Sequence, residues 1–299
     1  MIKDFQPELL PEVRELMIKA NRNILSRTFT GNWLSTFKGR GIEFSDYRQY
    51  ETGDDASMID WRASLRARKI LVKELTEEKN LNVLIVLDVS NSMLYGSGKY
   101  LKAEFAAQIA SSISFGALRA GDAVGLVTFA EGIRTFIQPN IGLKQHNIML
   151  SIIAEGKEYG GGFNLDKTLS EIMGAMKQRG MLIIISDYIG VSEKWHHYLE
   201  IARGRFEIVG INIRDPRDRR LPKHAGEYVL EDPYSEKKLI IDCAQYYAPY
   251  KKHVEKEEEA IKQAFRMVQG DVLLLEVGQE NYIQDLLLFF HKREQMIRA

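Results

Sequence analysis

Residues 82–92 read NVLIVLDVSNS, and this stretch decides the fold. The run 82–87 is almost entirely apolar and rich in β-branched side chains, as expected for a central parallel strand that is buried on both faces. The run stops abruptly at Asp88, where a loop rich in serine begins. We therefore expect a buried strand that carries polar side chains at its carboxyl end.

Strand-like and helix-like segments alternate after this stretch. The periodicity predicts further strands at 124–129, 133–137, 181–186 and 206–213, and helices at 99–119, 143–154, 164–178 and 192–203. Such alternation predicts an α/β fold, with a mostly parallel sheet, helices on both faces and right-handed crossovers. Ligands of such sheets bind at the carboxyl ends of the strands.

The flanking regions differ in texture from this core. Residues 8–20 have helical apolar spacing, whereas residues 27–79 are rich in glycine, aromatic residues and charges of alternating sign, which favours a solvated, ion-paired segment. Downstream we expect strands at 228–230, 238–242 and 272–277 and helices at 251–268 and 281–295. The predicted organisation is an N-terminal segment at 1–79, a core at 80–214, and a C-terminal extension at 215–299 that packs on the core.

Composition excludes several classes of protein. The 299 residues carry 41 basic and 41 acidic side chains, and a net charge of zero argues against a nucleic-acid or membrane-surface binder. Cys243 is the single cysteine, so an internal disulfide and a cysteine-type zinc site are both excluded. No signal-peptide core or apolar run of about 20 residues is present. We expect a soluble, cytoplasmic protein without a membrane span and without a nucleic-acid partner.

The loop after residue 87 has the chemistry of a cation site. Asp88, Ser90 and Ser92 alternate along it, so their side-chain oxygens can turn toward one point. Hard oxygen ligands suit Mg²⁺ or Mn²⁺, and Asp187 at the end of the predicted strand 181–186 would add a second carboxylate. A partner's carboxylate could take the remaining coordination position. The alternative is that Asp88 and the serines only cap the following turn.

These residues carry a family resemblance. The stretch 88–93, DVSNSM, resembles the metal-ion-dependent adhesion site of von Willebrand factor A domains, and 121–129, GDAVGLVTF, resembles the second strand of that fold. The upstream motifs GRGIEF at 39–44 and IDWRAS at 59–64 resemble those of one bacterial family, the domain of unknown function 58. The resemblance covers roughly residues 35–295 and implies a von Willebrand factor A-like fold with family-specific extensions at both ends.

The same resemblance implies a function without catalysis. Members of this family are thought to act as adaptors or co-chaperones of a MoxR-type AAA+ ATPase, which would make that ATPase and its client the partners of this chain. One position departs from the adhesion-site pattern, because Phe163 stands where a threonine normally binds the metal. Asn164 could supply an oxygen instead. Three hypotheses stay open: a metal-gated binding module, a metal-free scaffold of the same fold, and a metal-dependent hydrolase using Asp88 and Asp187.

A basic cluster lies in the upstream segment. It consists of Arg62, Arg66, Arg68, Lys69 and Lys73 and could grip a phosphate or an acidic partner. Ion pairing with Glu43, Asp54, Asp60 and Glu74 is the favoured interpretation. We further expect Trp61 to be a core anchor of this segment.

Overall fold

The computed structural model describes residues 42–51, 54–77, 81–222, 226–235 and 237–298, so the predicted helix at 8–20 lies outside the described residues. The chain divides into a larger compact unit that contains residues 82–299 and a smaller one within residues 37–81. The predicted core and the predicted C-terminal extension therefore belong to one compact unit.

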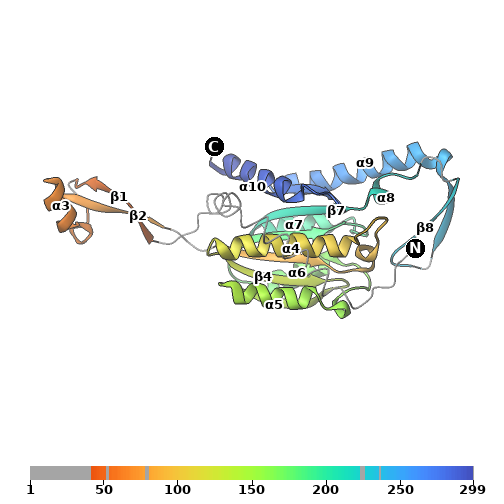
Figure 1. Cartoon of the computed structure of the whole chain (residues 1–299), viewed down its shortest axis with the longest axis horizontal. Coiled ribbons are helices and arrows are strands. Elements are labelled where there is room, and N and C mark those ends of the chain that lie inside the picture. Colours follow the sequence, from red (N-terminus) through yellow and green to blue (C-terminus); the bar gives the residue numbers. More distant parts are fainter. Residues whose placement is uncertain (1–41, 52–53, 78–80, 223–225, 236, 299) are drawn as a thin grey trace. The chain divides into compact units, whose positions relative to one another are not determined.

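A six-stranded sheet forms the centre of the larger unit (Figure 1). Its strands are β3 (Asn82–Asp88), β4 (Ala123–Phe129), β5 (Ile133–Asn140), β6 (Gly180–Ser186), β7 (Phe206–Arg214) and β10 (Asp271–Glu276). They lie in the order β10-β7-β6-β3-β4-β5, and all neighbours run parallel except the edge strand β5. The predicted α/β class with a mostly parallel sheet is confirmed.

The strand order places a switch point beside β3. From β3 the chain moves outward to β4 and β5, and it then returns to the other side of β3 to form β6, β7 and β10. The connections leaving β3 and β6 therefore diverge, which opens a crevice at the carboxyl ends of these two strands. Both strands are buried along nearly their whole length, in keeping with their uninterrupted apolar sequences.

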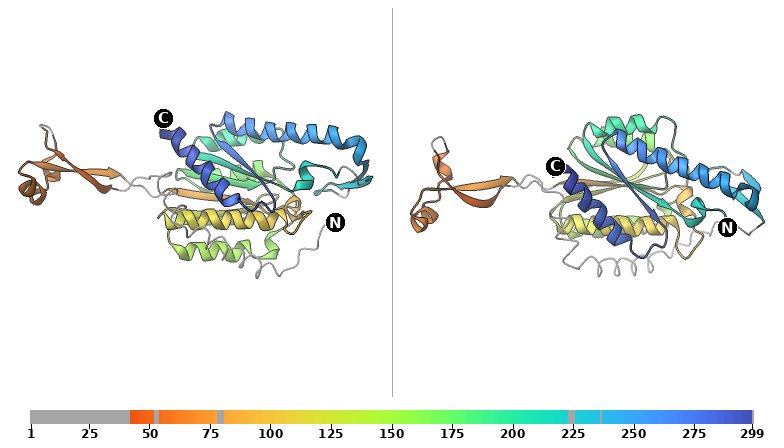
Figure 2. Two further views of the ribbon diagram at one scale, coloured as in Figure 1. Left: turned by 45° about the horizontal axis from the view of Figure 1, so that its top comes forward. Right: turned by 90° about the horizontal axis from the view of Figure 1, so that it is seen from above.

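Helices cover both faces of the sheet, as Figure 2 shows. One face packs against α6 (Leu165–Ala175), α7 (Trp195–Arg203) and α9 (Cys243–Met267) in a core that includes Leu84, Leu169 and Phe265. The other face carries α4 (Lys102–Arg119) with α5 (Leu143–Ile153) and α10 (Tyr282–Arg298), and Phe105 of α4 meets Tyr282 of α10 edge to face. Among the described residues, no helix combines the length and apolar composition needed to cross a membrane.

A hairpin and a long helix follow β7. After the short helix α8 (Pro216–Arg219), strands β8 (Glu227–Glu231) and β9 (Lys238–Asp242) pair antiparallel. Helix α9 then begins at Cys243, earlier than the predicted 251, because the Asp242 carboxylate caps the backbone N–H groups of Ala244 and Gln245.

The smaller unit has regular structure that the sequence did not predict. Strands β1 (Ile42–Gln49) and β2 (Leu71–Glu77) pair antiparallel, and α3 (Trp61–Ala67) lies between them in sequence. The Ser64 hydroxyl fastens α3 to β2, because it accepts the N–H of Leu71 at 2.9 Å and donates to Asp60 O at 2.7 Å. The prediction that Trp61 is a core anchor is wrong, since its side chain is 63% exposed.

Candidate strand-end site

Two carboxylates meet at the switch point of the sheet. Asp88 is the last residue of β3, and Asp187 follows the last residue of the neighbouring strand β6. Both side chains are completely buried. The sequence-predicted pair is therefore brought together in the crevice where ligands of parallel sheets bind.

Hydrogen bonds from its own loop and from β6 hold Asp88. Ser186 donates its hydroxyl to Oδ2 at 2.5 Å, and the backbone N–H of Ser90 donates to Oδ1 at 2.9 Å. Burial, together with the nearby charge of Asp187, raises the pKa of Asp88 well above its usual range. Asp88 thus performs the turn-capping role that the sequence left open.

A buried lysine neutralises Asp187. Lys102, in the first turn of α4, places Nζ 2.7 Å from Oδ2 of Asp187 and 2.8 Å from Oδ2 of Asp218. Burial alone would lower the pKa of Lys102, but the two carboxylates outweigh burial and raise it. The ammonium group therefore supplies the positive charge that the two aspartates need.

Tyr234 covers the two serines. It lies in the turn between β8 and β9, and its hydroxyl is 3.1 Å from Oγ of Ser90 and donates to Oγ of Ser92 at 2.9 Å. The same oxygen is 3.1 Å from the carbonyl oxygen of Ile189. Burial, with the charges of Asp187 and Asp88, raises the pKa of Tyr234, so this residue is a neutral phenol. The hairpin thus closes the loop in which the adhesion-site resemblance was found.

The glycine-rich loop supports this closure. Phe163 packs between Phe129 and Tyr234, with ring centroids 5.7 and 6.4 Å away, so the residue at the threonine position holds the covering tyrosine. Asn164 uses its side-chain oxygen to cap α6 at Lys167 N and is not directed at Asp88. Asn91 joins the two loops, because its side chain accepts Gly161 N and donates to Pro233 O.

The arrangement does not fit a divalent cation. An ion at this point needs free oxygen ligands, but Asp88, Asp187 and both serines already bond to Ser186, Lys102 and Tyr234. An ammonium 2.7 Å from Asp187 would also repel the ion. In the part of the chain that the structure describes, no group of three His, Cys, Asp or Glu side chains could hold a metal. Binding of Mg²⁺ or Mn²⁺ stays a prediction, and the geometry favours the metal-free alternative.

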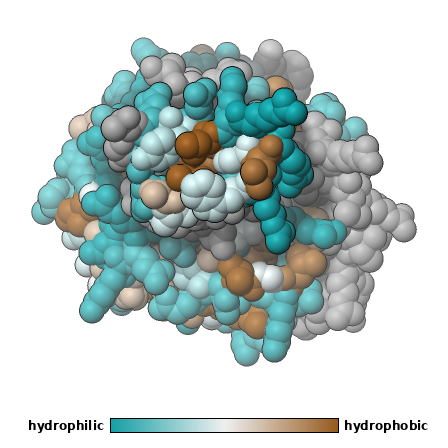
Figure 3. Space-filling view, turned by 90° about the vertical axis from the view of Figure 1, so that its left-hand side faces the viewer, coloured by the Kyte–Doolittle hydropathy of each residue, from teal (hydrophilic) through white to brown (hydrophobic). Residues whose placement is uncertain are grey.

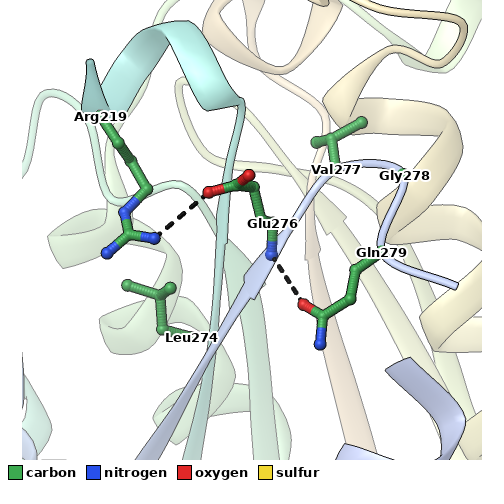
Figure 4. A pocket seen from close by; sticks show the side chains of 6 residues that line it. All are labelled: Arg219, Leu274, Glu276, Val277, Gly278 and Gln279. Atoms are coloured by element: carbon green, nitrogen blue, oxygen red, sulfur yellow. Dashed lines mark hydrogen bonds and ion pairs between the residues drawn. The ribbon is translucent and has the colours of Figure 1, made fainter. Parts of the chain in front are cut away.

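A separate open cavity of about 410 Å³ lies at the carboxyl end of β10 (Figure 4). Its charged groups satisfy each other, because Arg219 pairs with Glu276 at 3.2 Å and with Glu258 at 2.7 Å. Gln279 accepts the backbone N–H of Glu276. Its lining residues, Arg219, Leu274, Glu276, Val277, Gly278 and Gln279, include neither a histidine nor a nucleophile, so this cavity has no evident catalytic chemistry.

The sequence of this chain matches a known protein family over most of its length. Residues 46–260 match the family described as Protein of unknown function DUF58, and this chain belongs to that family. An uncharacterized protein of Mycobacterium tuberculosis is 28% identical over 231 residues, which cover 77% of this chain and 72% of the relative. The strand order and the strand-end aspartates agree with the predicted von Willebrand factor A-like fold, which is confirmed.

Two solved structures align with this chain at low sequence identity. An aerotolerance-related membrane protein from Bacteroides fragilis aligns with a TM-score of 0.50 and 13% identity, covering 72% of this chain and 100% of that chain. A von Willebrand factor type A structure from Catenulispora acidiphila aligns with a TM-score of 0.35 and 13% identity, covering 74% of this chain and 44% of that one. The first of these comparisons contradicts our prediction of a cytoplasmic protein, because the Bacteroides fragilis protein is described as a membrane protein.

Sequence reasoning missed Lys102, Asp218 and Tyr234 as residues of the site. Lys102 carried a signal, since a lysine in the first turn of a helix opposes the helix dipole and needs a partner. Tyr234 carried none, because it comes from a hairpin 142 residues after Ser92.

Proposed function

We propose that this chain is a non-enzymatic protein-interaction module that works without a resident metal ion. Family membership and the von Willebrand factor A-like fold support an interaction module. One observation supports a module without a metal ion: the polar groups of the strand-end site bond to each other. Lys102 takes the place of the cation, and Tyr234 covers the serines.

The same observation argues against the hydrolase hypothesis. A general base needs a lone pair that can reach a substrate, but the Asp88 and Asp187 carboxylates are buried and hydrogen-bonded. The groups bonded to these two carboxylates include no histidine. We therefore assign Asp88, Lys102 and Asp187 a structural role beneath the interaction face.

The interaction face surrounds the closed site. Its exposed rim includes Glu131, in the loop after β4, and Lys167, in the first turn of α6. Glu131 also accepts the N–H of Gly162, so the rim charge is fixed to the glycine-rich loop. In line with the family resemblance, we propose a MoxR-type AAA+ ATPase as the partner at this face.

Capture of the ATPase by the immobilised chain tests this proposal. The double variant Glu131→Lys/Lys167→Glu changes the rim charges and leaves the net charge unchanged, and we expect it to weaken capture about tenfold. The matched control Lys144→Glu/Glu200→Lys changes exposed charges on α5 and α7 and should capture normally. Equal capture by wild type and rim variant would rule out this face.

The metal-free part of the proposal has its own readout. Nucleotide-free ATPase should be captured equally well in EDTA and in MgCl₂, because the interaction face contains no resident ion. Loss of capture in EDTA would instead support the hypothesis of a metal-gated binding module.

A further inference from the structure

We infer that the outer face of α3, in the smaller unit, is a docking surface for an acidic, amphipathic segment of a partner protein. The inference rests on the proposed role as an interaction module, but it concerns a different unit of the chain from the strand-end site. We call this surface the α3 face and define it by Trp61, Arg62, Leu65 and Arg66.

Helix geometry places these four side chains together. Ser64 is buried and fastens α3 to β2, which fixes the inner side of the helix. At about 100° per residue, Arg62 and Arg66 form a stripe on the side opposite Ser64, and Trp61 and Leu65 form the adjacent stripe, roughly 60–100° around the helix from Ser64. The α3 face is therefore half apolar and half basic.

The apolar stripe is unusually open. Leu65 is 79% exposed and Trp61 is 63% exposed. Ile70, just beyond the helix, is 48% exposed. Figure 3 faces this unit and shows brown apolar atoms lying between teal hydrophilic ones on its surface. An exposed tryptophan beside arginines has the composition of interface hot spots.

Two of the acidic residues that the sequence suggested as partners of the cluster, Asp54 and Asp60, make other contacts. Asp54 is taken by Arg48, in a bidentate pair with both contacts at 2.6 Å. Asp60 accepts the N–H groups of Arg62 and Ala63 and the hydroxyl of Tyr47. The pairing expected for the whole cluster stays a prediction, because the side chains of Glu43, Lys73 and Glu74 lie outside the described residues.

Two further cations, Arg68 and Lys69, follow the basic stripe at the end of the helix. Arg66 donates to the carbonyl of Arg62, and Arg68 takes the left-handed conformation, with φ of 53°, that ends α3. Lys69 follows it, so four cations lie within eight residues, and within the described structure none of the four forms an ion pair. A local excess of positive charge on a chain of zero net charge complements a carboxylate-rich segment.

The apolar stripe decides between two kinds of polyanion. A nucleic-acid backbone would use the cations and could stack a base on Trp61, but it offers nothing aliphatic to cover Leu65. A protein segment with leucines and glutamates at helical spacing satisfies both stripes at once. We therefore assign the α3 face to an acidic protein segment.

A synthetic peptide tests this assignment on the full chain. The probe is a labelled peptide of about 16 residues in which leucines recur every fourth position among glutamates. We expect wild type to bind it and to lose at least about tenfold in affinity on Arg62→Glu/Arg66→Glu or on Trp61→Ala/Leu65→Ala, measured by fluorescence anisotropy. The matched control Lys144→Glu/Arg203→Glu makes the same charge change on the larger unit and should bind normally.

Two outcomes would overturn the assignment. The first is a negative result with the peptide. If the wild type does not bind it, the α3 face is not a docking surface for such a segment, and if the control variant loses as much affinity, the binding is not specific to the α3 face. The other is tighter binding of polyuridylate than of the peptide, with that binding lost in Arg62→Glu/Arg66→Glu, which would make the surface a nucleic-acid site. The peptide experiment does not use the ATPase, so its result does not depend on whether the rim variant captures the ATPase.

Discussion

The ammonium nitrogen of Lys102 lies 2.7 Å from Oδ2 of Asp187, and both side chains are almost completely buried. Asp218 adds a second carboxylate to the same ammonium at 2.8 Å. Because neither buried charge has access to bulk water, each depends on the other for its stability in the folded chain.

Replacing this lysine should therefore be costly. Lys102→Met leaves the Asp187 carboxylate buried without a counter-charge, and we expect the free energy of unfolding to fall by about 3–5 kcal/mol in urea denaturation. Lys167→Met is the control, since its pair with Glu171 spans 3.9 Å at an exposed site and should contribute less than about 1 kcal/mol. Similar losses in both variants would contradict the role given to Lys102.

The hydroxyl of Tyr234 provides a second test. Tyr234→Phe keeps the ring against Phe163 but removes the contacts with Ser90, Ser92 and Ile189, which should lower the free energy of unfolding by about 1–3 kcal/mol. Tyr246→Phe, in the exposed first turns of α9, should change it by less than about 0.5 kcal/mol. Should Tyr234→Phe prove neutral, the closure of the site by the hairpin would be refuted.

Metal addition and removal should leave the stability of the wild type unchanged. The Lys102 ammonium already supplies positive charge beside Asp187. A specific ligand of the native state raises the free energy of unfolding by roughly 2.7 kcal/mol when its concentration is about 100 times its Kd, and we expect no such rise with Mg²⁺ or Mn²⁺. The melting temperature is compared in EDTA, MgCl₂ and MnCl₂. A rise confined to the metal-containing samples would support the adhesion-site prediction instead.

His146 should make the fold sensitive to acid. Burial beneath α4 lowers its pKa to about 4, whereas an unfolded histidine titrates near about 6.5. Between these two pH values the unfolded chain binds more protons than the folded chain. The contribution of His146 to the free energy of unfolding is therefore fully present above about pH 6.5 and falls by about 2–3 kcal/mol as the pH drops toward 4. His146→Gln should flatten this part of a stability–pH curve, and an unchanged slope would show that other groups cause it.

Two glycine-to-alanine variants should change the free energy of unfolding in opposite directions. A Cβ on Gly210 would lie 2.5 Å from Cζ of Phe265, a fully buried ring, so Gly210→Ala should destabilise by about 1–3 kcal/mol. Gly174 in α6 has open space around it, and Gly174→Ala should stabilise by about 0.5–1 kcal/mol. Thermal unfolding of both variants measures the difference, and the same sign for both would contradict this packing.

The core of the fold was readable from sequence because its strands are buried on both faces. The run 82–87 and the run 181–186 are continuous apolar segments, and the polar residues that end them had to converge once the strands were neighbours. Asp88 and Asp187 were predicted together on that basis alone.

The smaller unit was not readable in the same way. A two-stranded ribbon has little buried surface, so β1 and β2 show charges of alternating sign where a central strand would show an apolar run. Trp61 was misjudged because its size suggests a core position, whereas its side chain is 63% exposed and Ser64 is the buried residue of α3.

The separation between Ser92 and Tyr234 has a consequence for how the chain is made. A ribosome adds roughly 5–20 residues per second, so the 142 positions between them take roughly 7–28 s to synthesise. β6 starts at Gly180, 88 positions after Ser92, so for roughly the first 4–18 s of that interval β6 is missing and one edge of β3 stays open. The nascent chain therefore passes through a stage at which an apolar central strand is exposed, and it should depend on holdase protection until β6 emerges.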